Sequence, residues 1–265
     1  MIVIGEKINA SIPSVREAIG RRDASFLAGL ARDQDAAGAD FIDVNAGEGG
    51  EGAVTMQWLV DVVRSATDKP LCIDSDDPEV LGAGLEVYRG DRVMINSVSA
   101  EPERLEVVGS LASRNEALVI ALVMDDGGIP RTVEERVRAA DIIVTSLAAH
   151  GINEERIFFD PLVLPVSVDS IQAGVTLKTI QALKERYPGA GTVMGLSNIS
   201  YGLPARGIVN RAFLLMAAAA GLDAAILNPL DKRLMTLVAT ADLLTGRDSR
   251  CKRFIRSYRK GELVQ

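Results

Sequence analysis

Carboxyl and amide side chains end several short apolar runs in this sequence. Asp74, Asn96, Asp160 and Asn198 each stand at such a position. Carboxylates accept hydrogen bonds, whereas amides both donate and accept them, so a cluster of the two can bind a donor-rich ligand, water or a metal ion. Because a buried polar group left unpaired costs about 1–3 kcal/mol, such a cluster predicts a bound molecule.

Helix capping is the alternative explanation for these residues. Asp and Asn often begin the loop between a strand and a helix because their side chains accept hydrogen bonds from the first N–H groups of the helix, so capping explains any single position. Several positions together favour a shared site. Further polar residues lie near the ends of other apolar runs: Glu6, Lys7, Asn9, Asp43, Asn45, Ser75, Ser97, Asp125 and Asn228.

A metal site is a second alternative, because Asp76, Asp77, Asp125 and Asp126 add further carboxylates. A transition-metal site would normally include histidine, and the single histidine, His150, lies at the predicted end of a helix, where the helix dipole explains it. We therefore predict no metal ligand set, although carboxylates holding Mg²⁺ loosely stay an open alternative.

Nucleophilic catalysis by the protein itself is not indicated. The sequence has no G-x-S-x-G motif, and Cys72 lies inside an apolar run, which predicts a buried core thiol. The reaction is therefore expected to use a nucleophile that a partner or a cofactor supplies.

Strands and helices alternate along the chain. Strands are predicted near 2–6, 40–45, 70–74, 92–97, 117–124, 156–160, 191–197 and 224–228, with helices between them, for example near Asp23, after Pro78, from Thr132 with a capping box at Glu135, and from Asp231. Eight such units predict an α/β fold, the (β/α)8 TIM barrel, whose strand ends bring the polar residues together. An open doubly wound sheet is the alternative, but the G-x-G-x-x-G turn typical of it is missing after the first strand.

Composition and charge restrict the remaining possibilities. With no Pro-rich or Ser-rich linker in 265 residues, we expect one domain over residues 1–265. A net charge of −7 argues against nucleic-acid binding. Cys72 and Cys251 are far apart and lack neighbouring ligands, which favours reduced thiols, and no signal segment or membrane-spanning run is predicted. The expected location is the cytoplasm.

Four segments carry a family resemblance: Cys72–Ser75, Met94–Ser97, Asp160–Val166 and Gly195–Ser200. This ordered set at the third, fourth, sixth and seventh strand ends resembles the methyltetrahydrofolate:corrinoid methyltransferases, nearly from end to end. It is also similar to the folate domain of cobalamin-dependent methionine synthase, here without a homocysteine or cobalamin module. The resemblance implies a pterin-binding barrel that moves a methyl group between N5 of tetrahydrofolate and the cobalt of cobalamin carried by a separate corrinoid protein.

Residue roles follow from this resemblance. It implies that Asp74, Asn96 and Asp160 bind the aminopyrimidine edge and the N8 side of the pterin, and that Asn198 is the catalytic residue that reaches N5. An amide can favour the protonated form of N5, and the departing nitrogen needs a proton or a strong hydrogen bond during methyl transfer.

The segment after the seventh strand supplies three further candidate site residues. Gly195 and Ser197 are expected to shape the wall of the same pocket. Arg206 is a candidate for binding the carboxylates of the folate tail, while a surface salt bridge or a place at a helix start explains it equally well. The segment Tyr201–Arg206 departs from the family pattern, which leaves the corrinoid partner and the direction of transfer open: methyltetrahydrofolate to Co(I), or methyl-Co(III) to tetrahydrofolate.

Two rival functions stay in view. A dihydropteroate-synthase-like enzyme would share the barrel, but its Ser-Arg-Lys and Arg-x-His strand ends are absent here. A noncatalytic folate-binding or corrinoid-binding protein would need the same pocket without an effect of Asn198 on turnover. The resemblance also implies a homodimer paired through outer helices, although ordinary core packing explains the Ala-rich helix near 212–220 equally well.

Overall fold

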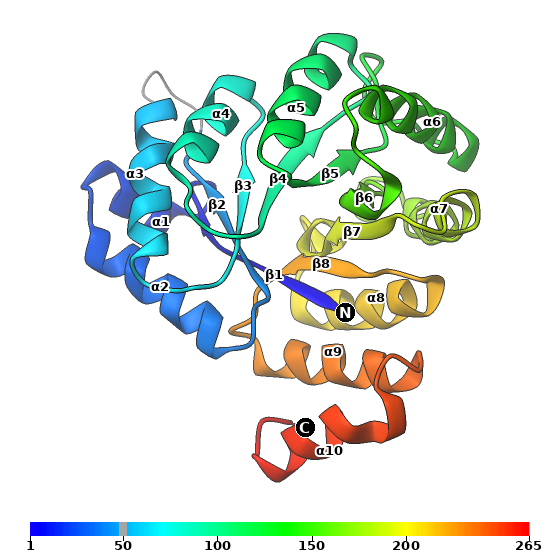
Figure 1. Ribbon diagram of the computed structural model, residues 1–265. Helices are drawn as coiled ribbons and strands as arrows, with labels where there is room; N and C mark the ends of the chain where they lie inside the picture. The colour runs from blue at the N-terminus through cyan, green and yellow to red at the C-terminus, as the bar shows by residue number, and fades with distance from the viewer. Residues whose placement is uncertain (48–51, 265) are drawn as a thin grey trace.

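The computed structural model describes residues 1–47 and 52–264 and shows a closed parallel barrel, so the predicted TIM barrel is confirmed (Figure 1). Each strand pairs with the next along the chain, and the last pairs with the first. The strands are β1 (Ile2–Asn9), β2 (Phe41–Asn45), β3 (Leu71–Asp74), β4 (Val93–Val98), β5 (Leu118–Leu122), β6 (Ile157–Asp160), β7 (Gly191–Gly195) and β8 (Ala224–Leu227).

Helices surround the barrel, and the C-terminal helix lies outside this ring against α9 (Figure 1). They are α1 (Pro13–Gly20), α2 (Ala24–Ala36), α3 (Gly52–Arg64), α4 (Pro78–Val87), α5 (Pro102–Arg114), α6 (Val133–Ala149), α7 (Gln172–Arg186), α8 (Arg206–Ala220), α9 (Lys232–Leu244) and α10 (Lys252–Arg259). Short 3₁₀ turns are η1 (Glu154–Arg156), η2 (Leu196–Ser200) and η3 (Ser249–Cys251). Within residues 1–47 and 52–264, no helix combines the length and apolar character needed to cross a membrane.

Side-chain caps explain where the four helices with a named predicted start begin. Asp23, Asp77 and Asp231 accept hydrogen bonds from backbone N–H groups in the first turns of α2, α4 and α9. Thr132 and Glu135 form the predicted capping box of α6. Helix α1 lacks such a side-chain cap, and its start is marked instead by Pro13 in the first turn, a signal that the prediction missed.

Strand β7 differs from the prediction. It ends at Gly195 rather than at residue 197, and η2 follows at once. Asn198 therefore lies in a helical turn and not at a strand end. A short 3₁₀ turn has no hydrophobic period of its own, so the apolar pattern of 191–197 looked like one continuous strand.

The barrel interior is filled by one side chain from each strand: Ile4, Phe41, Cys72, Met94, Ile120, Phe158, Val193 and Ala224. These residues form one cluster of buried side chains, and the larger apolar core lies between the strands and the helices. Because side chains alternate along a strand, the residue two positions further on points into the next layer of the barrel. That layer lies at the C-terminal ends of the strands.

Arg136 on α6 is fully buried and ties together the loops on this side of the barrel. Its guanidinium donates to the carbonyl oxygens of Pro161 at 2.7 Å and Leu162 at 3.1 Å, and to Gln172 Oε1 at 3.0 Å. Its Nε donates to the carbonyl of Pro130 at 3.0 Å. Arg136 thus holds the loop that directly follows Asp160.

We expect Arg136→Ala to lower the free energy of unfolding by about 3–5 kcal/mol, because the substitution leaves buried acceptors unpaired and opens a cavity. Arg138→Ala, on the same helix, is the matched control and should change stability by less than about 0.5 kcal/mol, because Arg138 is exposed. Urea denaturation of the three proteins measures the difference. Equal stabilities of the two variants would contradict this role for Arg136.

Candidate active site

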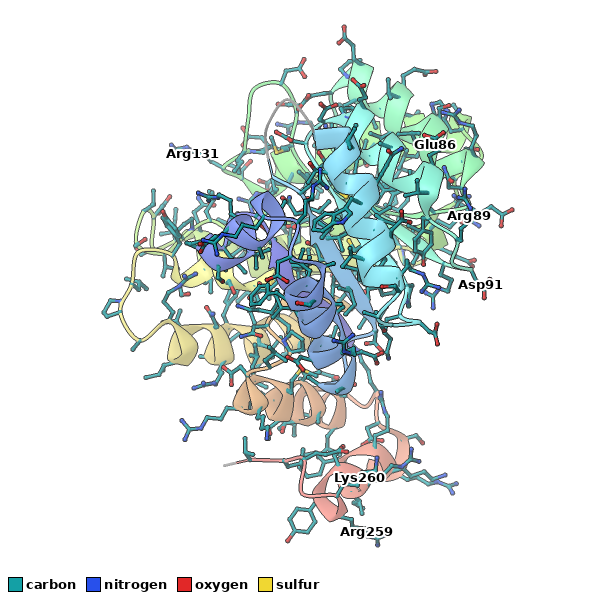
Figure 2. All side chains as sticks on the ribbon, turned by 90° about the vertical axis from the view of Figure 1, so that its left-hand side faces the viewer. Glu86, Arg89, Asp91, Arg131, Arg259 and Lys260 are labelled. Carbon is teal, nitrogen blue, oxygen red and sulfur yellow. The ribbon has the colours of Figure 1, made fainter. Side chains whose placement is uncertain are left out.

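Polar side chains dominate the layer that lies two residues beyond the barrel core. The residues at these positions, here called the acidic layer, are Glu6, Asp43, Asp74, Asn96, Leu122, Asp160, Gly195 and Ile226. Other charged side chains, such as Glu86, Arg89, Asp91, Arg131, Arg259 and Lys260, extend outward from the molecule and are exposed (Figure 2). Acidic groups inside a barrel require binding partners in a way that these surface charges do not.

Strands β2, β3 and β4 bring four of the polar residues into contact. Asn45 Nδ2 donates to Asp74 Oδ2 at 2.9 Å, and Asn96 Nδ2 donates to Asp43 Oδ1 at 3.4 Å. In the strand register, Asp74 pairs with Asn45 on one side and with Asn96 on the other. The structure thus brings together Asp74 and Asn96, two of the residues predicted for the site.

Asp160 enters the same layer from β6 on another side of the barrel. Its Oδ1 accepts a hydrogen bond from the backbone N–H of Leu162 at 2.8 Å, and the guanidinium of Arg136 is close enough to favour the charged carboxylate. These contacts fix the side chain but leave acceptor capacity unused, since a carboxylate accepts about four hydrogen bonds.

Burial raises the pKa values of these carboxyl groups. It raises the pKa of Asp74 to about 6, and that of Asp160 also to about 6. The pKa of Asp43 is raised well above its ordinary value by burial and by the nearby charge of Asp74, and burial likewise raises the pKa of Glu6. The acidic layer therefore holds protons near neutral pH that a donor-rich ligand can displace.

The turn η2 places Asn198 beside this layer. The Asn198 side chain is exposed, and a Cβ atom added to Gly195 would lie 3.3 Å from Asn198 Nδ2. The missing side chain at Gly195 thus leaves the room that the Asn198 amide occupies. Ser197 Oγ donates to both carboxylate oxygens of Glu6, at 3.2 and 3.3 Å.

Arg206 lies at the first residue of α8 and contacts the outer side of η2. Its Nη2 donates to the carbonyl oxygen of Ser197 at 2.7 Å, and its Nε donates to Ser200 Oγ at 3.0 Å. The guanidinium is exposed and retains Nη1 as a further donor. Arg206 therefore has the helix-start position that the sequence left open, and it is still able to bind an anion.

The other chemically interesting residues lie apart from this site. His150 follows the last residue of α6, as predicted, with its Nε2 3.4 Å from Glu106 Oε2. Cys72 is a buried thiol in the barrel core, as predicted, and Cys251 is exposed. Asp125 and Asp126 are exposed. Across residues 1–47 and 52–264, no three His, Cys, Asp or Glu side chains are arranged to hold a metal ion.

Glu6 and Asp43 belong to the acidic layer, and Asn45 donates a hydrogen bond to it, but none of the three was selected as a site residue from the sequence. The signal for two of them is the alternation along the strand: Glu6 stands two residues after Ile4, and Asp43 two residues after Phe41. The alternation shows which residues share a face of the strand, but the sequence alone does not show which of the two faces points into the barrel.

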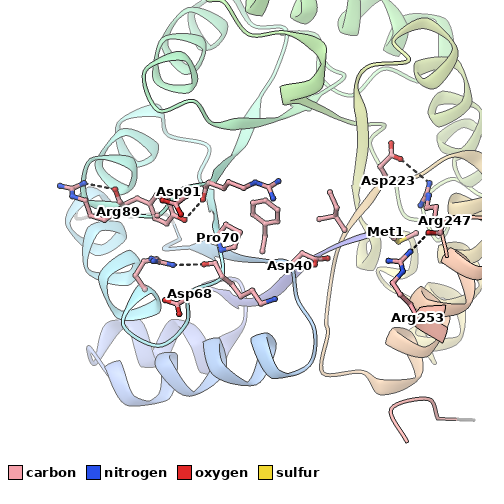
Figure 3. Close-up of a pocket in the computed structure, with 16 residues that line it drawn as sticks. Met1, Asp40, Asp68, Pro70, Arg89, Asp91, Asp223, Arg247 and Arg253 are labelled. Atoms are coloured by element: carbon pink, nitrogen blue, oxygen red, sulfur yellow. Dashed lines mark hydrogen bonds and ion pairs between the residues drawn. The ribbon is translucent and has the colours of Figure 1, made fainter. Parts of the chain in front are cut away.

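A cavity of about 880 Å³ lies at the opposite end of the barrel, where the strands begin (Figure 3). Its charged groups are already paired: Arg247 lies 3.5 Å from Asp223 in the cavity wall, and both Arg253 and the N-terminal ammonium of Met1 contact Asp242 outside it. Barrel enzymes carry their chemistry at the C-terminal ends of the strands, whereas the N-terminal face serves stability. We therefore assign the candidate active site to the acidic layer.

Two curated relatives cover most of this chain. It is 35% identical to "Methylcorrinoid:tetrahydrofolate methyltransferase" of Eubacterium limosum, over 99% of this chain and 98% of that protein. It is 34% identical to "Methionine synthase" of Mycobacterium tuberculosis over 86% of this chain, which corresponds to 20% of that much longer protein. The similarity predicted from four strand-end segments is confirmed.

Solved structures of dihydropteroate synthases share the fold. The enzyme of Xanthomonas albilineans in complex with 7,8-dihydropteroate superposes with a TM-score of 0.65 at 21% identity, covering 94% of this chain and 93% of that chain. The Thermus thermophilus enzyme gives a TM-score of 0.64 at 21% identity, covering 91% and 94% of the two chains. The model of the family described as "Pterin binding enzyme" matches residues 6–228. The chain therefore belongs to the pterin-binding enzyme family.

Proposed function

We propose that this protein is a methyltransferase that moves a methyl group between N5 of tetrahydrofolate and the cobalt of cobalamin held by a separate corrinoid protein. One observation carries the proposal: the chain is similar over 99% of its length to a protein named for this reaction. The acidic layer supports it, because its donors and acceptors complement a reduced pterin.

The pterin fits the acidic layer through its hydrogen-bond donors. Its amino group and ring N–H groups require acceptors, and the carboxylates of Asp74 and Asp160 supply them from different sides of the barrel. Asn96 offers both a donor and an acceptor, and its contact with Asp43 fixes the orientation of its amide. We assign these residues to the aminopyrimidine edge and the N8 side of the ring.

Asn198 is the proposed catalytic residue. When the methyl group leaves folate, the N5–C bond breaks, its electron pair stays on N5, and N5 takes up a proton as the C–Co bond forms. An amide beside N5 donates to the nitrogen that gains electron density, or accepts from N5–H in the reverse direction. The exposed position of Asn198 beside Gly195 and Ser197 leaves its amide accessible to a folate that enters the barrel mouth.

Arg206 is proposed to bind the carboxylates of the folate tail. Its guanidinium is exposed at the rim of the mouth, next to the turn that carries Asn198. A guanidinium recognises carboxylates through paired donors, and Nη1 is available for this contact. The corrinoid protein would approach the same open end, because the cobalt must reach the methyl group on N5.

Deprotonation of the acidic layer predicts how folate binding depends on pH. Asp74 and Asp160 accept hydrogen bonds best as carboxylates, and both have a pKa of about 6. Affinity for tetrahydrofolate should therefore rise with pH through about 6, and binding near that pH should release protons. Calorimetry in two buffers of different ionisation enthalpy measures the release, which Asp74→Asn should reduce. Proton uptake by the wild type would contradict this assignment.

A homodimer is proposed through α8 and the neighbouring loops. Ile208 and Met216 are 68% and 53% exposed and stand eight residues apart, on one face of α8. Val168, Ile171 and Tyr201 add exposed apolar surface in adjacent loop segments. We expect Ile208→Lys to convert a dimer into a monomer in light scattering, whereas Leu244→Lys, an exposed apolar position on α9, should not. A dimer that persists in Ile208→Lys would exclude this face.

The rival functions are separated by a product assay. The protein is incubated either with methyltetrahydrofolate and Co(I) cobalamin, or with 6-hydroxymethyl-7,8-dihydropterin pyrophosphate and 4-aminobenzoate. We expect methylcobalamin from the first pair and no dihydropteroate from the second. Dihydropteroate would establish the synthase alternative, and folate binding without either product would favour a noncatalytic protein.

With free thiols and no membrane-spanning helix among residues 1–47 and 52–264, we place this function in the cytoplasm.

A further inference from the structure

Glu6 links the first strand of the barrel to the turn that carries Asn198. It ends the inward-facing series of β1, and both of its carboxylate oxygens accept from Ser197 Oγ, at 3.2 and 3.3 Å. The two partners are 191 residues apart in the sequence. The contact is therefore a tertiary one, made between β1 and the turn after β7, with only β8 between these two strands in the barrel.

Turn η2 is held from both sides. Glu6 binds the Ser197 hydroxyl, and Arg206 binds the Ser197 carbonyl oxygen at 2.7 Å and Ser200 Oγ at 3.0 Å. The Asn198 side chain is exposed, and its backbone carbonyl oxygen accepts from the N–H of Tyr201 at 3.1 Å within the same turn. The orientation of the Asn198 amide therefore depends on the backbone of η2, and the contacts with Glu6 and Arg206 hold that backbone in place.

Charged groups from several elements face the Glu6 carboxylate. Burial has the largest effect and opposes its charged form, whereas Lys7 on the same strand and Arg206 on α8 favour that form. Asp43 on β2 also faces Glu6, and the charge of Glu6 raises the pKa of Asp43. The pKa of Glu6 is raised by its burial. A carboxylate accepts the Ser197 hydrogen bond more strongly than a neutral carboxyl group does, so the clamp weakens as Glu6 gains its proton.

We propose that Glu6 is a positioning residue for Asn198: by binding Ser197 it fixes the turn from which the Asn198 amide meets N5 of folate. The inference rests on the proposed function for its catalytic consequence. It assigns to Glu6 no contact with folate, so loss of this clamp should change turnover more than binding.

The first test compares Glu6→Gln, Ser197→Ala and the double variant with the control Glu185→Gln, an exposed position on α7. With methyltetrahydrofolate and Co(I) cobalamin at about pH 7.5, each single variant should lower kcat about tenfold, with KM within about threefold of the wild type. The double variant should be no slower than either single variant, because both remove one interaction. The wild-type advantage over Glu6→Gln should shrink as the pH falls through the raised pKa of Glu6, because the wild-type side chain then becomes neutral as well.

Unchanged kcat, additive losses or a rate ratio that is independent of pH would overturn the proposal. A second readout works without catalysis. The side-chain amide resonance of Asn198, identified by its loss in Asn198→Ala, should shift or broaden in Glu6→Gln and Ser197→Ala but not in Glu185→Gln. A resonance that does not move overturns the role of Glu6 even in a protein without transferase activity. If the wild type is inactive but the Asn198 resonance shifts in Glu6→Gln and Ser197→Ala, the proposed reaction is rejected and the positioning role of Glu6 is retained.

Discussion

Asn198→Ala is expected to lower the rate of methyl transfer about 100-fold while changing folate affinity by less than about fivefold, because a hydrogen bond needed mainly as charge develops contributes chiefly to the transition state. Asn198 lies beside the acidic layer and not within it, and its exposed amide lies beside Gly195. The pterin edge would still be bound by Asp74, Asn96 and Asp160 in this variant.

Single-turnover kinetics with methyltetrahydrofolate and Co(I) cobalamin measure the rate, and calorimetry measures the affinity. Asn153→Ala, at an exposed asparagine that makes no side-chain cap hydrogen bond before η1, is the matched amide control and should keep both values close to those of the wild type. Equal turnover of Asn198→Ala and wild type would remove Asn198 from the mechanism. A parallel loss of rate and affinity would make it a binding residue.

Asp74→Asn is expected to raise the free energy of unfolding at about pH 8 while it weakens folate binding. Burial raises the pKa of Asp74 from 3.8 to about 6, so the folded protein holds a proton that the unfolded chain releases between these values. The wild type therefore loses stability as pH rises through this range, by about 1–3 kcal/mol in full. The asparagine variant carries no such charge and should be more stable by that amount at about pH 8, with no gain near pH 4.

The same substitution should weaken tetrahydrofolate binding at least about 30-fold at pH 8, because it replaces a buried charged acceptor with a neutral amide. Urea denaturation across pH and calorimetry measure the two effects. Asp125→Asn, at an exposed carboxyl group, is the control for both. A variant that is less stable at pH 8, or one that binds folate as well as the wild type, would contradict the position and role given to Asp74.

The fold could be predicted from the sequence because eight apolar runs alternate with amphipathic segments, and that alternation leads to few architectures. Thr132 with Glu135, and Asp231, mark helix starts by local hydrogen bonds alone. Local signals of this kind depend on residues three or fewer apart, so they are visible before any tertiary contact is known. The missed start of α1 and the misjudged end of β7 have no such side-chain cap.

The candidate site was only partly predictable for a different reason. Asp74 and Asp77 stand three residues apart, yet Asp74 faces the barrel interior while Asp77 caps α4. Asp and Asn are common in both places, and only the closed strand register decides which residue faces inward. Glu6 gains its role from Ser197, and Arg136 from carbonyl groups on two loops, and neither contact leaves a local pattern.

The most direct measurement is anaerobic methyl exchange between methyltetrahydrofolate and Co(I) cobalamin, followed by the cobalamin absorbance in both directions, with wild type and Asn198→Ala side by side. The wild type is expected to form methylcobalamin, added tetrahydrofolate should reverse the change, and Asn198→Ala should do both about 100-fold more slowly. Tight folate binding by the wild type without exchange in either direction, with free cobalamin and with corrinoid proteins as acceptors, would contradict the proposed function.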